Sequence, residues 1–197
     1  MFTPRCPLIL ASASPRRRDM LSQLGLTYTC IPTNIDETPI AGEGPRTFAR
    51  RMAIEKAEAA AGQNKNACII GADTVVAIQD RILGKPQDMK EAKEYLNILN
   101  GNIHTVLTAF ALIKKDADLN IAQHAETQVT FGHFPQAVLN AYADTGDPLD
   151  KAGAYGMQGL GSFLVVSIQG SASNVIGLPI SLFIQTMLQH HLVRLKV

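Results

Sequence analysis

The feature that most limits the fold is a short apolar run at residues 8–11 that leads almost directly into a helix start. Ser14 is a good N-cap, and Pro15 fits the first helical position, where an N–H group is not needed. An apolar stripe at helical spacing follows, and Gly25 ends the helix. The run therefore predicts a strand–turn–helix unit of the kind found in α/β proteins.

The rest of the chain alternates strand and helix signals, with a strand-rich stretch in the middle. Small residues recur at helical spacing over 45–61, which permits close packing of that helix. Helices are predicted over residues 45–61, 88–99, 135–144 and 178–192, and strands over 28–31, 67–71, 103–114, 121–131 and 163–168. The pattern predicts an α/β fold with a mixed twisted sheet and flanking helices, in a single domain covering residues 1–197.

Composition excludes several classes of protein. Hydrophobic residues make up 46% and charged residues 18% of the 197 positions, which argues against disorder. A net charge of +1 gives no global electrostatic case for binding nucleic acid or an anionic membrane. No stretch approaches the ~18 apolar residues of a membrane span. Three scattered cysteines suit a reducing compartment, so we expect a cytoplasmic protein.

The turn after the first strand is a candidate phosphate site. Ser12, Ser14, Arg16 and Arg17 lie where the helix begins, and free backbone N–H groups at a helix N-terminus bind anions. Arginine is well suited to bidentate phosphate contacts. The alternative is an ordinary N-cap followed by a solvated basic turn.

Two acidic positions are candidate ligands for a hard cation. Glu37 follows Asp36 in a polar loop, and Asp73 follows the strand predicted at residues 67–71. Mg²⁺ commonly takes one or two carboxylates together with substrate phosphates, and an aspartate at such a position can also act as a general base. The alternatives are a solvated loop acid for Glu37 and a turn-capping side chain for Asp73.

Other polar residues could contact a ligand. Lys85 lies in a Gly-Lys-Pro turn and Lys56 on the small-residue helix, and either could offset phosphate charge or simply be solvated. Gln158 lies in the glycine-rich segment 150–159 and can donate and accept hydrogen bonds, as reading a base edge requires. His104 is expected to be structural. The histidines lack zinc-hydrolase spacing, and the chain has no Gly-x-Ser-x-Gly elbow and no Walker motif.

Taken in order, these segments resemble one family, the Maf (septum formation inhibitor) nucleotide pyrophosphatases. The matching positions are 10–17, 35–37, 53 with 56–57, 71–75, 84–86 with 88, 150–155 with 158–159, and 174–175 with 177–179. The resemblance implies two lobes around a central cleft, in a fold shared with inosine triphosphate pyrophosphatases. It also implies hydrolysis between the α- and β-phosphates with a divalent cation, Mg²⁺ or Mn²⁺.

The same resemblance implies roles for individual residues. Asp73 matches the catalytic base, and Arg16, Thr74 and Gln158 match the specificity determinants of the branch acting on dTTP and UTP. In a sister branch acting on 7-methyl-GTP, an aromatic residue replaces the arginine, Gln replaces the threonine and Glu replaces the glutamine. This sequence departs little from the family pattern, although residues 170–173 lack the aromatic side chains that some relatives have at these positions.

We therefore expect a dTTP and UTP pyrophosphatase that releases the monophosphate and pyrophosphate. Ser12, Ser14, Arg16 and Arg17 are expected to bind the phosphates, with Lys56 and Lys85 offsetting their charge. The metal is expected to be held by Glu37 and Asp73. The expected partner is a small nucleoside triphosphate, not nucleic acid or membrane, and a homodimer is left open. Two alternatives are a nucleotide-binding regulator of cell division without turnover and a pyrophosphatase for modified pyrimidine nucleotides.

Overall fold

The computed structural model describes residues 1–79 and 81–196, which form two compact units. The first unit comprises Met1–Asp73, Thr108–Ala125 and Gly177–Val197. The second comprises Thr74–Leu107 and Glu126–Ile176. The chain thus passes between the units several times, and three long strands contribute residues to both.

Within the described residues the main sheet has seven strands in the order β3-β2-β4-β6-β7-β8, with β5 paired to β4. The strands are β2 (Leu8–Leu10), β3 (Thr29–Cys30), β4 (Cys68–Ile78), β5 (Arg81–Leu83), β6 (Ile103–Lys114), β7 (Leu119–Phe131) and β8 (Val165–Gln169). Strand β2 is parallel to β3 and β4, whereas β5 and β8 are antiparallel to their partners. The predicted mixed sheet is therefore confirmed.

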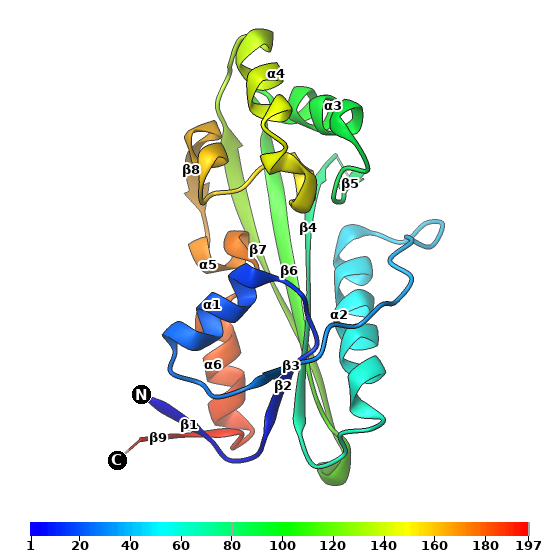
Figure 1. Cartoon of the computed structure of the whole chain (residues 1–197), viewed down its shortest axis with the longest axis vertical. Helices are drawn as coiled ribbons and strands as arrows, with labels where there is room; N and C mark the ends of the chain where they lie inside the picture. Colours follow the sequence, from blue (N-terminus) through cyan, green and yellow to red (C-terminus); the bar gives the residue numbers. More distant parts are fainter. Residues whose placement is uncertain (80, 197) are drawn as a thin grey trace. The chain divides into compact units, whose positions relative to one another are not determined.

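Helices account for most of the remaining regular structure (Figure 1). They are α1 (Pro15–Gln23), α2 (Pro45–Ala61), α3 (Met89–Leu99), α4 (Gln136–Asp144), α5 (Ala172–Ile176) and α6 (Ile180–Gln189). Short 3-10 segments lie at Lys115–Ala117, Asp147–Asp150, Ala152–Ala154 and Leu160–Leu164. No helix in the described part of the chain is both long enough and apolar enough to cross a membrane.

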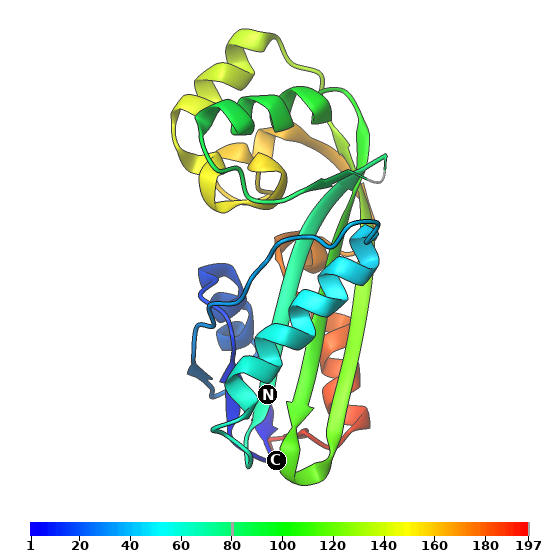
Figure 2. The same ribbon diagram turned by 90° about the vertical axis from the view of Figure 1, so that its right-hand side faces the viewer.

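In the first unit, α2 runs along β4 on one side of the sheet and α6 lies on the other (Figures 1 and 2). Gly71 explains how closely α2 approaches, because a Cβ atom there would lie 2.1 Å from the Ala53 carbonyl oxygen and 2.9 Å from the Ala57 Cβ. On α6, Phe183 packs edge-on against Phe110 of β6, with ring centroids 5.4 Å apart. The small-residue face of 45–61 thus makes the close contact that its spacing permits.

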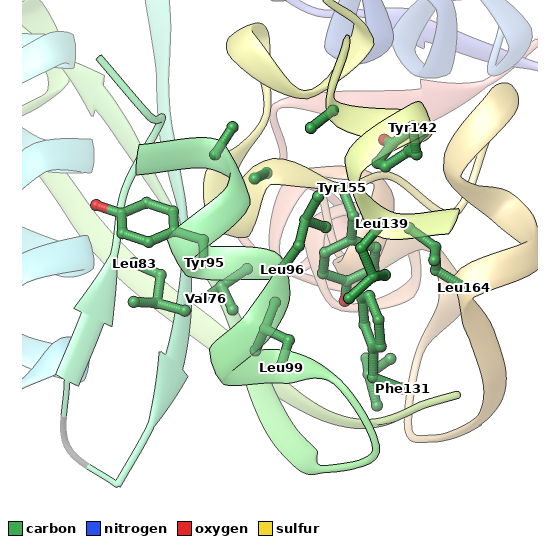
Figure 3. Close-up of a cluster of buried hydrophobic side chains, with 14 of the residues drawn as sticks. Val76, Leu83, Tyr95, Leu96, Leu99, Phe131, Leu139, Tyr142, Tyr155 and Leu164 are labelled. Carbon is green, nitrogen blue, oxygen red and sulfur yellow. The ribbon is translucent and has the colours of Figure 1, made fainter. Parts of the chain in front are cut away.

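The second unit has its own hydrophobic core, shown in Figure 3. Leu96 and Leu99 from α3, Leu139 from α4 and Phe131 from β7 are buried in it. Tyr155 of the glycine-rich segment also inserts its ring there, edge-on to Phe131 with centroids 5.4 Å apart. The core therefore anchors a loop segment as well as the regular elements.

The structure differs from the sequence-based prediction in a few places. The strand expected from Phe163 begins at Val165, because Leu160–Leu164 forms a 3-10 turn. The strand predicted at 67–71 does not end before Asp73: β4 runs through Asp73 to Ile78 without a break. The terminal pair β1 (Phe2–Pro4) and β9 (Val193–Leu195) was not predicted, since each strand is only three residues long.

Candidate functional site

The parallel strands of the first unit bring three candidate segments together beyond the aligned residues of β2, β3 and β4, in the carboxyl-terminal direction of these strands. Leu10 of β2 lies beside Cys30 of β3 and Ile70 of β4 in the strand register. Ser12 follows the end of β2, the loop bearing Glu37 follows β3, and β4 runs on past Ile70 to Asp73. Ligands of α/β sheets commonly bind at the carboxyl ends of parallel strands.

The start of α1 is built as the sequence predicts. The Ser14 hydroxyl caps the helix by accepting a hydrogen bond from the Arg17 backbone N–H at 3.4 Å. The Ser12 hydroxyl accepts from the Ser14 backbone N–H at 3.2 Å, which fixes the turn before the helix. The positive end of the helix dipole therefore lies beside two hydroxyl groups, and this arrangement favours an anion.

The two arginines at this point are not equivalent. Arg17 is buried, and its guanidinium donates to the Gly177 carbonyl at 2.8 Å and to the Ser12 hydroxyl at 3.2 Å. Burial lowers the pKa of Arg17 from its ordinary value, although an arginine remains charged in proteins. Arg17 thus ties α1 to the segment before α6, whereas Arg16 is only half-buried.

Glu37 and Asp73 converge on one positive charge, the ammonium group of Lys56. The Lys56 Nζ atom lies 2.7 Å from Asp73 Oδ1 and 2.9 Å from Glu37 Oε1. Lys56 and Asp73 are buried, whereas the Glu37 side chain is 52% exposed. The close approach of α2 at Gly71 carries Lys56 to this position, one helical turn along from Ala53.

The environment of Asp73 suits a base. Burial raises the pKa of Asp73 above its ordinary value, while the positive charges of Lys56 and Arg17 oppose that shift. A carboxylate whose pKa moves toward neutrality is a better proton acceptor at physiological pH than an ordinary one.

The donor set also fits a divalent cation. Carboxylate oxygens are the ligands that Mg²⁺ and Mn²⁺ prefer, and those of Glu37 and Asp73 already meet around one cationic group. Across residues 1–79 and 81–196, no group of three or more His, Cys, Asp or Glu side chains lies together as a metal site. A metal held here would thus take only two protein carboxylates and fill its other positions with water and substrate phosphate, as Mg²⁺ commonly does.

The remaining candidates lie in the second unit, where two of their segments meet. The Gly153 backbone N–H donates to the Gly84 carbonyl at 3.0 Å, which joins the turn bearing Lys85 to the segment bearing Gln158. Lys85 and Gln158 are exposed, and Thr74 on β4 is half-buried. Gly153 has a positive φ of 68° and lies directly on Val76, so a side chain at Gly153 would clash with β4.

His104 has a larger structural role than the sequence indicates. Its Nε2 atom lies 2.6 Å from the Tyr155 hydroxyl, and both residues are buried. Its Nδ1 atom is buried with no hydrogen-bond partner within the described part of the chain. Burial lowers the pKa of His104 to about 4, so the ring is neutral near pH 7. The histidine within the strand predicted at 103–114 is the sequence signal for this pair.

Comparison with known proteins places these features in a family. Residues 7–190 match the family described as Maf-like protein. A dTTP/UTP pyrophosphatase of Desulfotalea psychrophila is 45% identical over 187 residues, which cover 95% of this chain and 96% of that protein. A dTTP/UTP pyrophosphatase of Bacillus anthracis is 40% identical over 185 residues, 94% of this chain and 96% of that protein.

Among solved structures, the Staphylococcus aureus Ham1 protein has a similar fold. Its TM-score is 0.58 at 14% sequence identity, and the match covers 94% of this chain and 99% of that chain. This likeness concerns the fold alone, and it agrees with the predicted α/β class.

Proposed function

The chain belongs to the Maf family, and from that premise we propose that it is a nucleoside triphosphate pyrophosphatase acting on dTTP and UTP. The products are the nucleoside monophosphate and pyrophosphate. The observation that carries the proposal is the buried Asp73 carboxylate, 2.7 Å from Lys56, whose ammonium also contacts Glu37. Relatives that cover nearly the whole chain and bear this activity in their names support it.

In the proposed reaction, Asp73 orients a water molecule and accepts its proton. The water oxygen forms a new bond to the α-phosphorus as the bond from that phosphorus to the bridging oxygen breaks. Pyrophosphate then leaves with the electron pair of the broken bond.

The phosphates bind at the start of α1 in this proposal. The hydroxyls of Ser12 and Ser14 supply hydrogen-bond donors there, beside the positive end of the α1 dipole. Arg16 contacts a phosphate directly. Arg17 contributes charge from a fixed position, because its guanidinium is bound to the Gly177 carbonyl and the Ser12 hydroxyl.

Glu37 and Asp73 would hold Mg²⁺ or Mn²⁺, since their oxygens form the donor set such ions prefer. When bound, the cation withdraws charge from the phosphate oxygens and stabilises the departing pyrophosphate. Lys56 and Lys85 offset the phosphate charge that remains. Thr74 and Gln158 are assigned to the pyrimidine base. Together with Arg16 they resemble the specificity positions of the dTTP and UTP branch.

The match over residues 7–190 includes parts of both compact units, which supports treating residues 1–197 as one functional domain. The cytoplasm is the proposed location, and the free thiols of Cys6, Cys30 and Cys68 suit its reducing conditions.

A panel of nucleoside triphosphates tests the proposal, each incubated with Mg²⁺ and analysed for product identity. We expect dTMP or UMP with pyrophosphate, and much slower turnover of purine nucleotides. Tight binding of dTTP without turnover would instead indicate a nucleotide-sensing protein. Faster turnover of modified pyrimidine triphosphates than of dTTP would shift the physiological substrate toward those.

The variant Asp73→Asn tests the assignment of the base. We expect it to lose at least about 1,000-fold in kcat while its circular dichroism spectrum stays unchanged, because general-base catalysis and metal binding are both impaired. Asp36→Asn is the matched control, since Asp36 is exposed and its carboxylate accepts hydrogen bonds from the backbone N–H and the side chain of nearby Thr38. Retained turnover in Asp73→Asn would remove Asp73 from the mechanism.

A further inference from the structure

Lys56 occupies the position where the two carboxylates of the proposed metal site meet. Its ammonium lies 2.9 Å from Glu37 Oε1 and 2.7 Å from Asp73 Oδ1, and all three residues belong to the first unit. The side chains of Lys56 and Asp73 are only 10% and 9% exposed. The lysine is therefore the counter-ion of a buried carboxylate.

A buried carboxylate needs such a partner. Leaving one charge of a buried ion pair without its partner is strongly destabilising, so Asp73 requires a cation on its oxygens in the folded protein. Mg²⁺ binds carboxylate oxygens at about 2.0–2.1 Å, and a divalent ion at that distance would repel an ammonium in contact with the same atoms. The metal and the Lys56 ammonium therefore compete for these oxygens.

Lys56 and Arg17 both place positive charge near Asp73. Lys56 is the one whose side chain can move away from the Asp73 carboxylate. The Arg17 guanidinium is fixed by hydrogen bonds to the Gly177 carbonyl at 2.8 Å and the Ser12 hydroxyl at 3.2 Å. The Lys56 ammonium contacts the carboxylates of Glu37 and Asp73 themselves, and its four-carbon stem can rotate while α2 stays in place. Displacement of Lys56 therefore requires no movement of the backbone.

We propose that Lys56 is a counter-ion that exchanges with the metal: it holds Glu37 and Asp73 when no metal is bound, and it leaves them when the metal binds. This inference rests on the proposed function for the presence of a metal. Its consequence is that Lys56 weakens metal binding to the free protein. The displaced ammonium then remains available to a substrate phosphate, so metal binding and substrate binding favour each other.

The test is to titrate the full chain with Mn²⁺ in the absence of nucleotide. Binding is measured from the electron paramagnetic resonance signal of the free ion. Lys56→Met keeps a side chain of similar length and removes the competing charge. We expect it to bind Mn²⁺ about tenfold more tightly than the unmodified protein, within the roughly 5–150-fold range of typical couplings. Lys56→Arg keeps the charge and is expected to gain no affinity.

Thermal unfolding gives a second readout. Metal-free Lys56→Met should melt at a lower temperature than the unmodified protein, and saturating Mn²⁺ should remove most of the difference. Arg51→Met is the matched control, because Arg51 also lies on α2 and pairs with Glu43 at 2.7 Å and Glu55 at 3.2 Å. It should lose stability equally with and without Mn²⁺ and keep the original Mn²⁺ affinity.

Equal or weaker Mn²⁺ binding by Lys56→Met would overturn the inference. If that variant is unfolded without metal, refolding on addition of Mn²⁺ supports the exchange, and failure to refold at any Mn²⁺ concentration contradicts it. These results are separable from the proposed function. An unmodified protein that hydrolyses dTTP while Lys56→Met gains no affinity refutes only the exchange, whereas an unmodified protein without turnover refutes the proposed function.

Discussion

Gly71→Ala is the substitution that most directly probes how the fold builds the site. A Cβ atom at Gly71 would lie 2.1 Å from the Ala53 carbonyl oxygen, 2.7 Å from the Ala57 backbone nitrogen and 2.9 Å from the Ala57 Cβ. Two of these three atoms belong to the α2 backbone, so no side-chain rotation can relieve the clash. Helix α2 would have to move away from β4.

The size of the effect follows from these distances. Non-bonded heavy atoms are most favourably placed at about 3.5–4.0 Å, so α2 would have to move by roughly 1 Å or more. Overpacking of a core costs about 1–3 kcal/mol and occasionally more, and backbone clashes place this case at the upper end. A cost of about 3 kcal/mol corresponds to a fall in Tm of roughly 6–12 °C for a chain of this size. Because α2 carries Lys56 to Asp73, a shift of about 1 Å could also lower kcat/KM by about 100-fold.

The assay is thermal unfolding together with dTTP turnover at a temperature where the variant is folded. Gly62→Ala is the control, because Gly62 follows the end of α2 with helical φ and ψ and a Cβ atom there would meet nothing within 4 Å. That control should keep its Tm and its activity. A Gly71→Ala protein with unchanged Tm and turnover would refute the claim that close contact at Gly71 positions Lys56.

Three further predictions concern buried polar groups. Because the pKa of His104 is lowered to about 4, only the unfolded chain takes up its proton between pH 6.5 and 4, and stability is lost as pH falls through that window. Urea unfolding should show that the free energy of unfolding falls by about 3 kcal/mol between pH 6.5 and 4, and that this fall is absent in His104→Gln. Asn174→Ala should cost about 2 kcal/mol in the same assay, because the Asn174 amide donates to the Thr127 hydroxyl at 2.9 Å in a fully buried position. Arg17→Lys should lower both Tm and nucleotide affinity, since lysine cannot reproduce the two hydrogen bonds of the guanidinium, including the bond to the Gly177 carbonyl; an unchanged Tm would contradict that role.

Much of the fold could be predicted because its signals are local. Ser14 and Pro15 identify the start of α1, and the small-residue spacing of 45–61 gives the bounds that α2 has in the structure. The strand predicted at 103–114 likewise has the bounds of β6. Capping, helical spacing and apolar runs each depend on a few neighbouring residues, so they can be read without knowledge of long-range contacts.

Features that depend on distant partners could not be predicted. The pair β1 and β9 joins the two ends of the chain, and three-residue strands carry no periodicity. The 3-10 turn Leu160–Leu164 was predicted partly as strand, because an apolar run alone does not distinguish these structures. Sequence reasoning also identified the candidate site residues one by one, yet it assigned Lys56 to phosphate and gave no sign that Lys56 joins Glu37 to Asp73.

Hydrolysis of dTTP in ¹⁸O-labelled water with Mg²⁺ tests the central claim most directly, with ³¹P NMR and mass spectrometry of the products. The account predicts dTMP and pyrophosphate, with the ¹⁸O label in dTMP, because water attacks the α-phosphorus. Release of dTDP and orthophosphate would contradict it. So would label in the pyrophosphate, which would place the attack on the β-phosphorus.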